Sequence, residues 1–369
     1  MNGQWLGTYS GSNDGTIIVN IDERPSAYQG IAYLHDSNSI MPSMAAGFAT
    51  NGKGQNIQCR TTWIAPINPK TGHLDTWENA KTHFSYNIAI PQYADITGGW
   101  TSESLSLSWH TNINTFGSCS LPKSQANQPS KLVAAEIDWE TYKSSVSKLE
   151  AYKYVFRGQN EPWRLRTSFH RSGRAELSRF LSEDILALHK NLSSRTRHVF
   201  DLDKPSENGA FLNLVQHHGY PTPLLDWSYS PYVAAFFAFR GITKEEAENA
   251  PPNKKVRIYA FDQEQWKQNF SQSQLVHTPF PHLSIGEYLA IENERMIPQQ
   301  AVTTITNIDD IESYLISRSK PENPYLWAID IPANERSKAI HELRYMGITA
   351  GSLFPGLDGS CEELKERNF

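Results

Sequence analysis

The chain is poor in the features that mark a secreted or membrane-spanning protein. Its 369 residues include only three cysteines, Cys59, Cys119 and Cys361, and their spacing matches no metal-binding pattern. An odd number of cysteines without a local partner is typical of a reducing compartment rather than of a disulfide-stabilised domain. Because the sequence also lacks an apolar run of about eighteen residues, no transmembrane helix and no membrane partner are predicted.

Basic runs and an N-terminal leader are missing as well. The first residues do not combine a basic stretch with an apolar one, so no signal peptide is predicted. The net charge is -5 and no Lys/Arg cluster stands out, which excludes a dedicated binder of duplex nucleic acid. With 39% hydrophobic residues the chain can form ordinary cores. The composition therefore predicts a cytoplasmic, globular protein, and the length predicts two domains.

The first 137 residues contain no amphipathic segment of helix length. Residues 16–21 form a β-branched run behind a turn cluster, and residues 105–109 alternate strictly between apolar and polar, as strands do. Gly, Asn, Ser and Pro recur between such runs. We therefore expect an all-β domain, a barrel or a sandwich, over residues 1–137. Its expected role is recognition or regulation, through a protein partner or a ligand.

The second part of the chain mixes helix and strand patterns. Residues 118–131 are polar and contain two prolines, which indicates a junction between domains. The predicted strands are 256–261 and 326–331, and the predicted helices are 138–152, 176–192, 231–239 and 338–346. Residues 138–369 are therefore expected to form an α+β domain.

Candidate binding residues begin at the end of the apolar run 154–156. Arg157 carries a permanent charge and a rigid donor fork that suits phosphate or carboxylate, and Gly158 would let a ligand approach the backbone. The alternative for Arg157 is a structural ion pair with an acid of the same domain.

A second group of candidates is Gln216, His217 and His218. On a helix adjacent side chains point about 100° apart, so at most one of the two histidines is expected to face a given pocket. There it can act as a general base or contact a ribose hydroxyl. The alternative is a core histidine bonded to the backbone. Metal binding is not predicted, because no second ligand lies at a suitable spacing.

Two further segments carry polar residues beside apolar runs. Asp226 is expected either to orient His217 or Arg157 or to cap the following turn. Trp227, which precedes Ser228, is expected either to stack on a base or to pack in the core.

In the other segment, Arg295 and Gln299 are candidates for orienting a ligand. Glu292 and Glu294 are spaced like residues on one strand face, a pattern that suits paired carboxylate chemistry. The alternative is a solvated turn.

Together these segments resemble the FRG-domain family, whose name matches Phe-Arg-Gly at 156–158. The similarity covers about 150–365, and its other blocks are 163–171, 216–238, 294–300 and 343–359. One departure is Pro223, where the family usually carries Arg, so a charge beside the histidines is missing.

The order of the site residues is also similar to that of toxin-type ADP-ribosyltransferases. In those enzymes an early arginine holds the NAD pyrophosphate, and a later Glu or Gln steers the nucleophile. The resemblance implies NAD as cofactor, with catalytic candidates His217, His218, Glu294 and Gln299. It implies that the ligand is held by Arg157, Gly158, Gln216, Asp226, Trp227, Ser228 and Arg295.

The two resemblances imply an intracellular effector that binds NAD or another nucleotide. It would be an ADP-ribosyltransferase or an NAD-consuming toxin in bacterial defence against phage. One alternative is a non-enzymatic protein that senses a nucleotide or a phage component. Another is a protein-recognition barrel attached to a scaffold domain.

Overall fold

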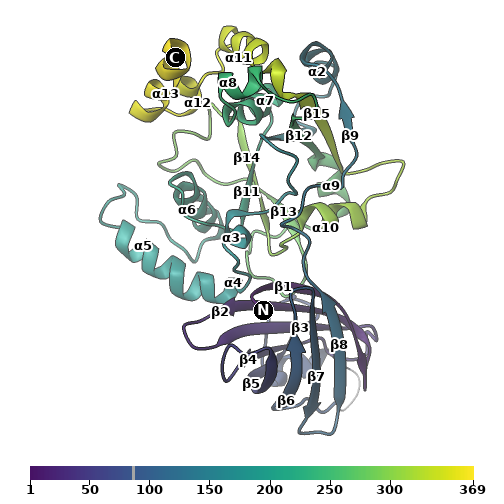
Figure 1. Ribbon diagram of the computed structural model, residues 1–369. Coiled ribbons are helices and arrows are strands. Elements are labelled where there is room, and N and C mark those ends of the chain that lie inside the picture. Colours follow the sequence, from purple (N-terminus) through teal and green to yellow (C-terminus); the bar gives the residue numbers. More distant parts are fainter. Residues whose placement is uncertain (85–87) are drawn as a thin grey trace.

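The computed structural model describes residues 1–84 and 88–369 and consists of a β-barrel followed by a mixed α/β domain (Figure 1). The barrel is closed, and its strands pair antiparallel in chain order, with β1 also pairing with β8. The strands are β1 Gly3–Gly11, β2 Gly15–Glu23, β3 Tyr28–Asp36, β4 Met44–Ala49, β5 Asn56–Pro66, β6 Ala94–Trp100, β7 Ser104–Thr111 and β8 Phe116–Pro122. The predicted all-β domain is confirmed, and of the two predicted architectures the structure has the barrel.

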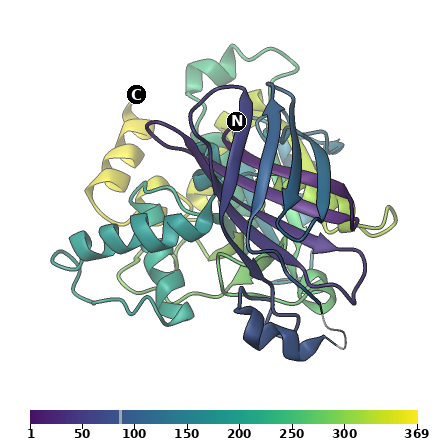
Figure 2. The same cartoon turned by 90° about the horizontal axis from the view of Figure 1, so that it is seen from below.

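Alternation of buried and exposed side chains directs one face of each strand into the barrel. In β8 every second residue is buried, as expected for a strand with one solvated face. The inward apolar side chains form a core that includes Trp5, Ile17 and Val19. Between β5 and β6 the chain forms two short helical segments, α1 (Trp77–Ala80) and η1 (Lys81–His83), at the side of the barrel (Figure 2).

The C-terminal domain is built on one sheet with the strand order β13-β14-β11-β10-β12-β15-β9. All neighbours pair antiparallel except β15 and β9, which are parallel. The strands are β9 Ala134–Glu136, β10 Tyr154–Gln159, β11 Leu224–Ser228, β12 Lys255–Asp262, β13 Leu283–Gly286, β14 Ala301–Thr306 and β15 Leu326–Pro332. The predicted mixture of helices and strands is confirmed.

Helices cover both faces of this sheet. One face packs against α2, α7, α11 and α12, and the other against α9 and α10. A third cluster joins α3 to α6 with β11 and β14. The helical segments are α2 Trp139–Val146, α3 Ser168–Arg171, α4 Leu177–Arg179, η2 Phe180–Ile185, α5 Leu186–Leu192, α6 Pro205–His217, α7 Pro231–Arg240, α8 Lys244–Glu248, α9 Gln263–Asn269, α10 Ile311–Arg318, η3 Ala333–Glu335, α11 Arg336–Tyr345, α12 Ala350–Leu353 and α13 Leu357–Asn368.

The predicted helices are present, with differences that have local causes. The helix expected to reach residue 152 ends at Val146, and Tyr152 adopts a left-handed backbone with φ 65°. The helix expected over 176–192 forms as α4, the π-helical η2 and α5 in succession. In α7 the Ser230 side chain accepts a hydrogen bond from the Val233 amide, and Pro231 occupies the first turn, where its missing N–H leaves no bond unmade.

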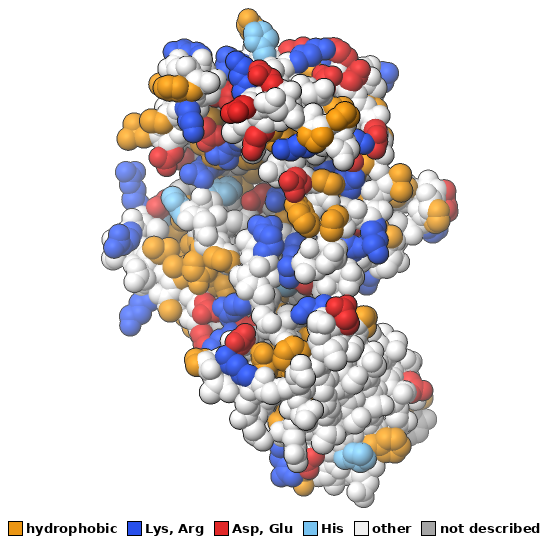
Figure 3. Space-filling model, viewed as in Figure 1, with side chains coloured by type: hydrophobic (Ala, Val, Ile, Leu, Met, Phe, Trp, Pro, Cys, Tyr) orange, Lys and Arg blue, Asp and Glu red, His pale blue; other side chains and the backbone are white. Residues whose placement is uncertain are grey.

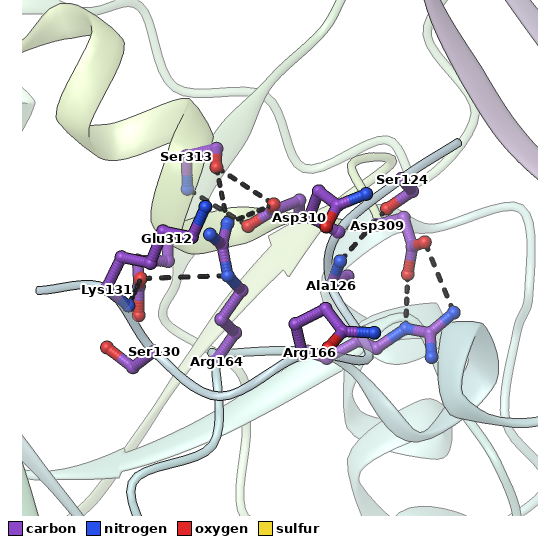
Figure 4. Close-up of polar contacts among 12 residues, drawn as sticks. Ser124, Ala126, Ser130, Lys131, Arg164, Arg166, Asp309, Asp310, Glu312 and Ser313 are labelled. Atoms are coloured by element: carbon purple, nitrogen blue, oxygen red, sulfur yellow. Dashed lines mark hydrogen bonds and ion pairs between the residues drawn. The ribbon is translucent and has the colours of Figure 1, made fainter. Parts of the chain in front are cut away.

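The chain already contributes a strand to the second sheet before residue 137. The last barrel strand ends at Pro122, and β9 already pairs with β15 of the second sheet. Three residues are too few for an alternating pattern, so the sequence does not mark β9 as a strand. The linker before it is fixed to α10, because the Lys131 amide donates to Glu312 Oε1 at 3.0 Å. The segment after β10 reaches the same helix, since Arg164 Nη1 donates to Asp310 Oδ2 at 2.6 Å (Figure 4).

Buried polar contacts join the barrel to the C-terminal domain. The Asp22 carboxylate is 1% exposed, accepts from the Ala175 amide at 2.8 Å and forms ion pairs with Arg174 and Arg179. On β1, Gln4 Nε2 donates to the Asn307 carbonyl at 2.6 Å. These contacts bury charged and polar groups, which are stable there only because each has its partner in the other domain.

Candidate functional site

The candidate site is a cavity at the point where β10 and β11 separate. The two strands pair only at Phe156 and Ser228. Beyond this pair the ladder is replaced by a side chain, because Arg157 Nη1 donates to the Asp226 carbonyl at 2.7 Å. The cavity has a volume of about 250 Å³. Its wall is formed by Phe156, Arg157, Gly158, His217, Asp226, Trp227, Ser228, Ala234, Phe237, Arg295, Gln299 and Phe354.

Arg157 is deeply placed but not neutralised by a contacting acid. Among the residues that the structure describes, no carboxylate oxygen lies within ion-pair distance of its guanidinium, and its Nε has no hydrogen-bond partner. Burial lowers the pKa of Arg157 to about 10, although the Asp226 charge acts in the opposite direction. Since a buried guanidinium is stabilised by an anion, the site favours a negatively charged ligand. The alternative of a structural ion pair for Arg157 is not what the structure shows.

Gly158 has a packing role that the sequence did not indicate. A Cβ atom there would lie 1.9 Å from the Ala234 carbonyl oxygen and 2.6 Å from the Ala238 amide nitrogen. Both atoms belong to the backbone of α7, so the glycine allows α7 to lie directly on β10. The sequence predicted that a ligand approaches the Gly158 backbone, but α7 occupies that position. The same helix forms one wall of the cavity.

His217 is held in one orientation by a chain of amides. Its Nδ1 lies 2.8 Å from Asn293 Oδ1, Asn293 Nδ2 donates to Asn213 Oδ1 at 2.9 Å, and Asn213 Nδ2 donates to Thr303 Oγ1 at 2.9 Å. Because Asn293 presents its carbonyl oxygen, a neutral His217 carries its proton on Nδ1. The Nε2 lone pair is then free to accept a proton or a hydrogen bond.

Arg295, Gln299 and Phe354 close the cavity from a later part of the chain. Arg295 Nη1 donates to the His217 carbonyl at 2.8 Å, and its guanidinium carbon lies 5.4 Å from the centre of the Phe354 ring. Gln299 Nε2 donates to the Leu353 carbonyl at 2.9 Å. Phe354 was not among the predicted site residues, although it lies in the block 343–359 where a family resemblance was expected.

The remaining candidates fall into two groups. His218 and Glu294 are exposed and do not line the cavity, and the Gln216 side chain accepts a hydrogen bond from Thr222 instead. Of the two histidines, therefore, only His217 faces this cavity.

The side chains of Trp227 and Ser228 are committed to the fold. The Trp227 indole donates to Thr304 Oγ1 at 3.0 Å and packs in the core, and Ser228 Oγ donates to the Gln299 carbonyl at 2.7 Å. They form part of the cavity wall, but their hydrogen-bond donors are already used within the protein.

The expected pairing of Glu292 with Glu294 does not occur at the cavity. Glu292 is exposed, has a left-handed backbone with φ 52°, and accepts a hydrogen bond from the His198 amide at 2.5 Å. Asp226 is thus the one carboxylate among the described residues that line the site. Its Oδ1 is buried and has no hydrogen-bond partner.

The described residues form neither a metal-binding cluster nor a membrane-spanning helix. They contain no group of three or more His, Cys, Asp or Glu side chains that could hold a metal ion. No helix among them combines the length and apolar character needed to span a bilayer.

Comparison with known proteins locates one family on the chain. Residues 152–247 match the FRG domain model. Neither the curated proteins nor the solved structures include a match to this chain. The matched residues run from just before β10 to α8 and supply Arg157, His217 and Asp226, whereas Arg295, Gln299 and Phe354 lie beyond them. The chain therefore contains an FRG domain, which follows an eight-stranded barrel and shares its sheet with the C-terminal strands.

Proposed function

We propose that the cavity of the C-terminal domain binds a phosphate-bearing small molecule of the nucleotide class, with NAD as the leading candidate. The observation that carries the proposal is the pair of guanidiniums at one cavity. Arg157 and Arg295 both donate hydrogen bonds to backbone carbonyls, and among the described residues neither forms an ion pair with a carboxylate. Guanidinium groups in this state bind phosphate oxygens through charge-assisted hydrogen bonds.

The size of the cavity limits how such a molecule is held. Its volume of about 250 Å³ lies just below the range of roughly 300–1,000 Å³ that is usual for sites of drug-sized ligands. The cavity therefore accommodates one phosphate and ribose portion, and the rest of a dinucleotide extends over the surface. Phe237 and Phe354 provide apolar walls on which a base or a nicotinamide ring can pack.

The residues also suggest how NAD would be consumed. Water attacks C1′ of the nicotinamide-bearing ribose, the bond to nicotinamide breaks, and His217 Nε2 accepts the proton that the water loses. The products are ADP-ribose, nicotinamide and a proton. Transfer of ADP-ribose to a protein or nucleic acid follows the same scheme, with an acceptor group in place of water. Gln299 is the residue proposed to orient the attacking group, because Glu294 lies off the cavity.

Such a reaction would make the protein an NAD-consuming effector, and in a bacterial cell under phage attack it would act as a toxin. The second candidate function is a sensor that binds the nucleotide without chemistry. It is favoured by the hydrogen bonds that the Gln299 and Ser228 side chains already donate to backbone carbonyls, because these bonds engage groups that would otherwise orient an attacking molecule.

Calorimetric titration with NAD, ADP-ribose and nicotinamide tests the binding step. Arg157→Met and Arg295→Met are each expected to weaken ADP-ribose binding at least tenfold, since a hydrogen bond to a charged group contributes about 1.5–3 kcal/mol. Arg318→Met is the matched control, because Arg318 stacks on Tyr314 away from the cavity. Unchanged affinity in both cavity variants, with their melting temperatures preserved, would refute the phosphate role.

Turnover separates the effector from the sensor. The full chain is incubated with NAD labelled in the adenine and with cell extract, and released nicotinamide and labelled macromolecules are measured. His217→Gln is expected to abolish release while ADP-ribose binding stays within threefold of wild type. Binding of NAD without release or transfer in any extract would favour the sensor.

A further inference from the structure

The barrel contains a second cavity, of about 190 Å³. It lies at the barrel end formed by the β1–β2 turn, the end of β3 and the β7–β8 turn. The opposite end is filled by Met1, Trp5 and Ile21, next to the contacts with the C-terminal domain. The wall is mostly aliphatic and includes Ile17, Leu34, Met44, Ile57, Ile96 and Leu107. No part of the nucleotide proposal uses this cavity.

Small side chains at matching positions leave this space open. Ala32 on β3 lies directly opposite Ala46 on β4, and both line the cavity. Inward positions of the neighbouring strands carry larger side chains, such as Ile64 and Ile96. Barrel interiors of eight strands are normally filled by side chains, so a facing pair of alanines removes the atoms that would fill this one. Both alanines are half-buried, which shows that the inner wall is reachable from outside.

The polar groups at this end set the charge of the site. Among the described residues that line the cavity, Asp36 is the one charged side chain. Its Oδ2 accepts from Asn13 Nδ2 at 2.6 Å, and its Oδ1 accepts from the Asn38 amide at 2.8 Å. Burial raises the pKa of the Tyr9 hydroxyl, and the nearby Asp36 and Asp14 carboxylates add to this effect. The cavity therefore has an apolar interior and a polar edge that repels anions.

We propose that the barrel binds a small apolar molecule, of the size of one or two aromatic rings or a short acyl chain, whose polar end is neutral or cationic. A dry apolar cavity of about 150 Å³ is large enough to bind benzene, and this one is larger. Asp36 and Asn13 accept hydrogen bonds from a hydroxyl or an ammonium group at the edge. A carboxylate is rejected, because no described lining residue is Lys or Arg.

The outer surface agrees with a site inside the barrel rather than on it. In the face shown in Figure 3 the barrel presents mainly uncharged polar side chains and backbone, with few apolar groups gathered together. In β6 and β8 the outward positions carry Thr97, Ser118 and Ser120, which are exposed. A binding surface for another protein usually has an apolar centre, and the face of the barrel in this view shows none.

The experiment uses the full chain and the neutral fluorescent probe N-phenyl-1-naphthylamine. We expect saturable binding, with displacement by octanol and octylamine at concentrations at least tenfold below those needed for octanoate. Ala46→Phe and the milder Ala46→Leu fill the cavity and are expected to weaken probe binding at least tenfold. Thr97→Phe adds the same ring to the outside of the barrel and is expected to leave binding within twofold.

Circular dichroism checks that each variant keeps the folded barrel. If Ala46→Phe unfolds, the milder Ala46→Leu is used for the test. Asp36→Asn is expected to reduce the ratio between the octanoate and octanol concentrations needed for displacement by about fivefold. Absence of saturable probe binding in the wild type, or equal binding by wild type and folded Ala46→Leu, would overturn the proposal. Equal displacement by octanoate and octanol would overturn the assigned charge class.

Discussion

Replacing Gly158 with alanine tests the tightest contact of the C-terminal domain. The new Cβ would lie 1.9 Å from the Ala234 carbonyl oxygen, whereas ordinary contacts begin at 3.4 Å. To relieve the overlap α7 must move away from β10 by roughly 1.5 Å. The helix buries six of its ten residues, so this movement loosens the core along its whole length. Overpacking usually costs 1–3 kcal/mol, and a clash with backbone belongs at the upper end, about 3 kcal/mol.

Thermal unfolding of the full chain, followed by circular dichroism, measures this effect. For a domain of this size about 3 kcal/mol corresponds to a fall in Tm of roughly 6–12 °C. Gly219→Ala is the control, because Gly219 has φ +87° and open space around it, so the substitution carries only a conformational cost of about 1–2 kcal/mol. If Gly158→Ala lowers Tm no more than Gly219→Ala and instead abolishes ligand binding, Gly158 serves the ligand and the packing argument fails.

Three further predictions concern buried polar groups. Burial raises the pKa of Glu176 to about 7 from 4.5, so the folded state keeps a proton that the unfolded chain loses. The free energy of unfolding should therefore fall by up to about 3 kcal/mol between pH 4.5 and 7, and urea titrations of Glu176→Gln should lack this slope while the exposed Glu183→Gln keeps it. Asp22→Ala leaves two arginines without their shared partner and should cost about 3–5 kcal/mol; a loss below 1 kcal/mol in urea would show that water replaces the carboxylate. Asn293→Ala should let the His217 proton move from Nδ1 to a mixture of both nitrogens in ¹⁵N spectra, and an unchanged spectrum would show that another group fixes it.

Elements with a local cause were predictable from the sequence. Strict alternation marked β7, and Ser230 followed by Pro231 marked the start of α7, because both signals lie within a few adjacent residues. Alternation alone fits a barrel and a sandwich equally, since closure depends on the pairing of β1 with β8 across the whole domain. The parallel strand β9 was missed for the same reason, as its three residues are defined by β15.

The candidate site was predictable in its residue types but not in its geometry. Arg157 and His217 stood out as polar groups beside apolar runs, and the structure brings them to one cavity. Their roles as ligand contact and base stay predictions. The tautomer of His217 depends on Asn293, 76 residues away, and no local pattern records such a contact. Phe354 carries no polar group, so nothing in its chemistry distinguished it from a core residue.

Because β10 and β11 are joined by a single residue pair, the sheet consists of two parts that are weakly connected. The first part contains β13, β14 and β11, and the second contains β10, β12, β15 and β9. Arg157 lies on β10 in the second part. His217 ends α6, which packs on the first part, and Arg295 lies just before β14. A molecule bound by both arginines would connect the two parts of the sheet, so the sheet would become more rigid as more of the protein is in the ligand-bound state. Slower hydrogen exchange along β11 would then report how full the cavity is, even for a ligand that undergoes no reaction.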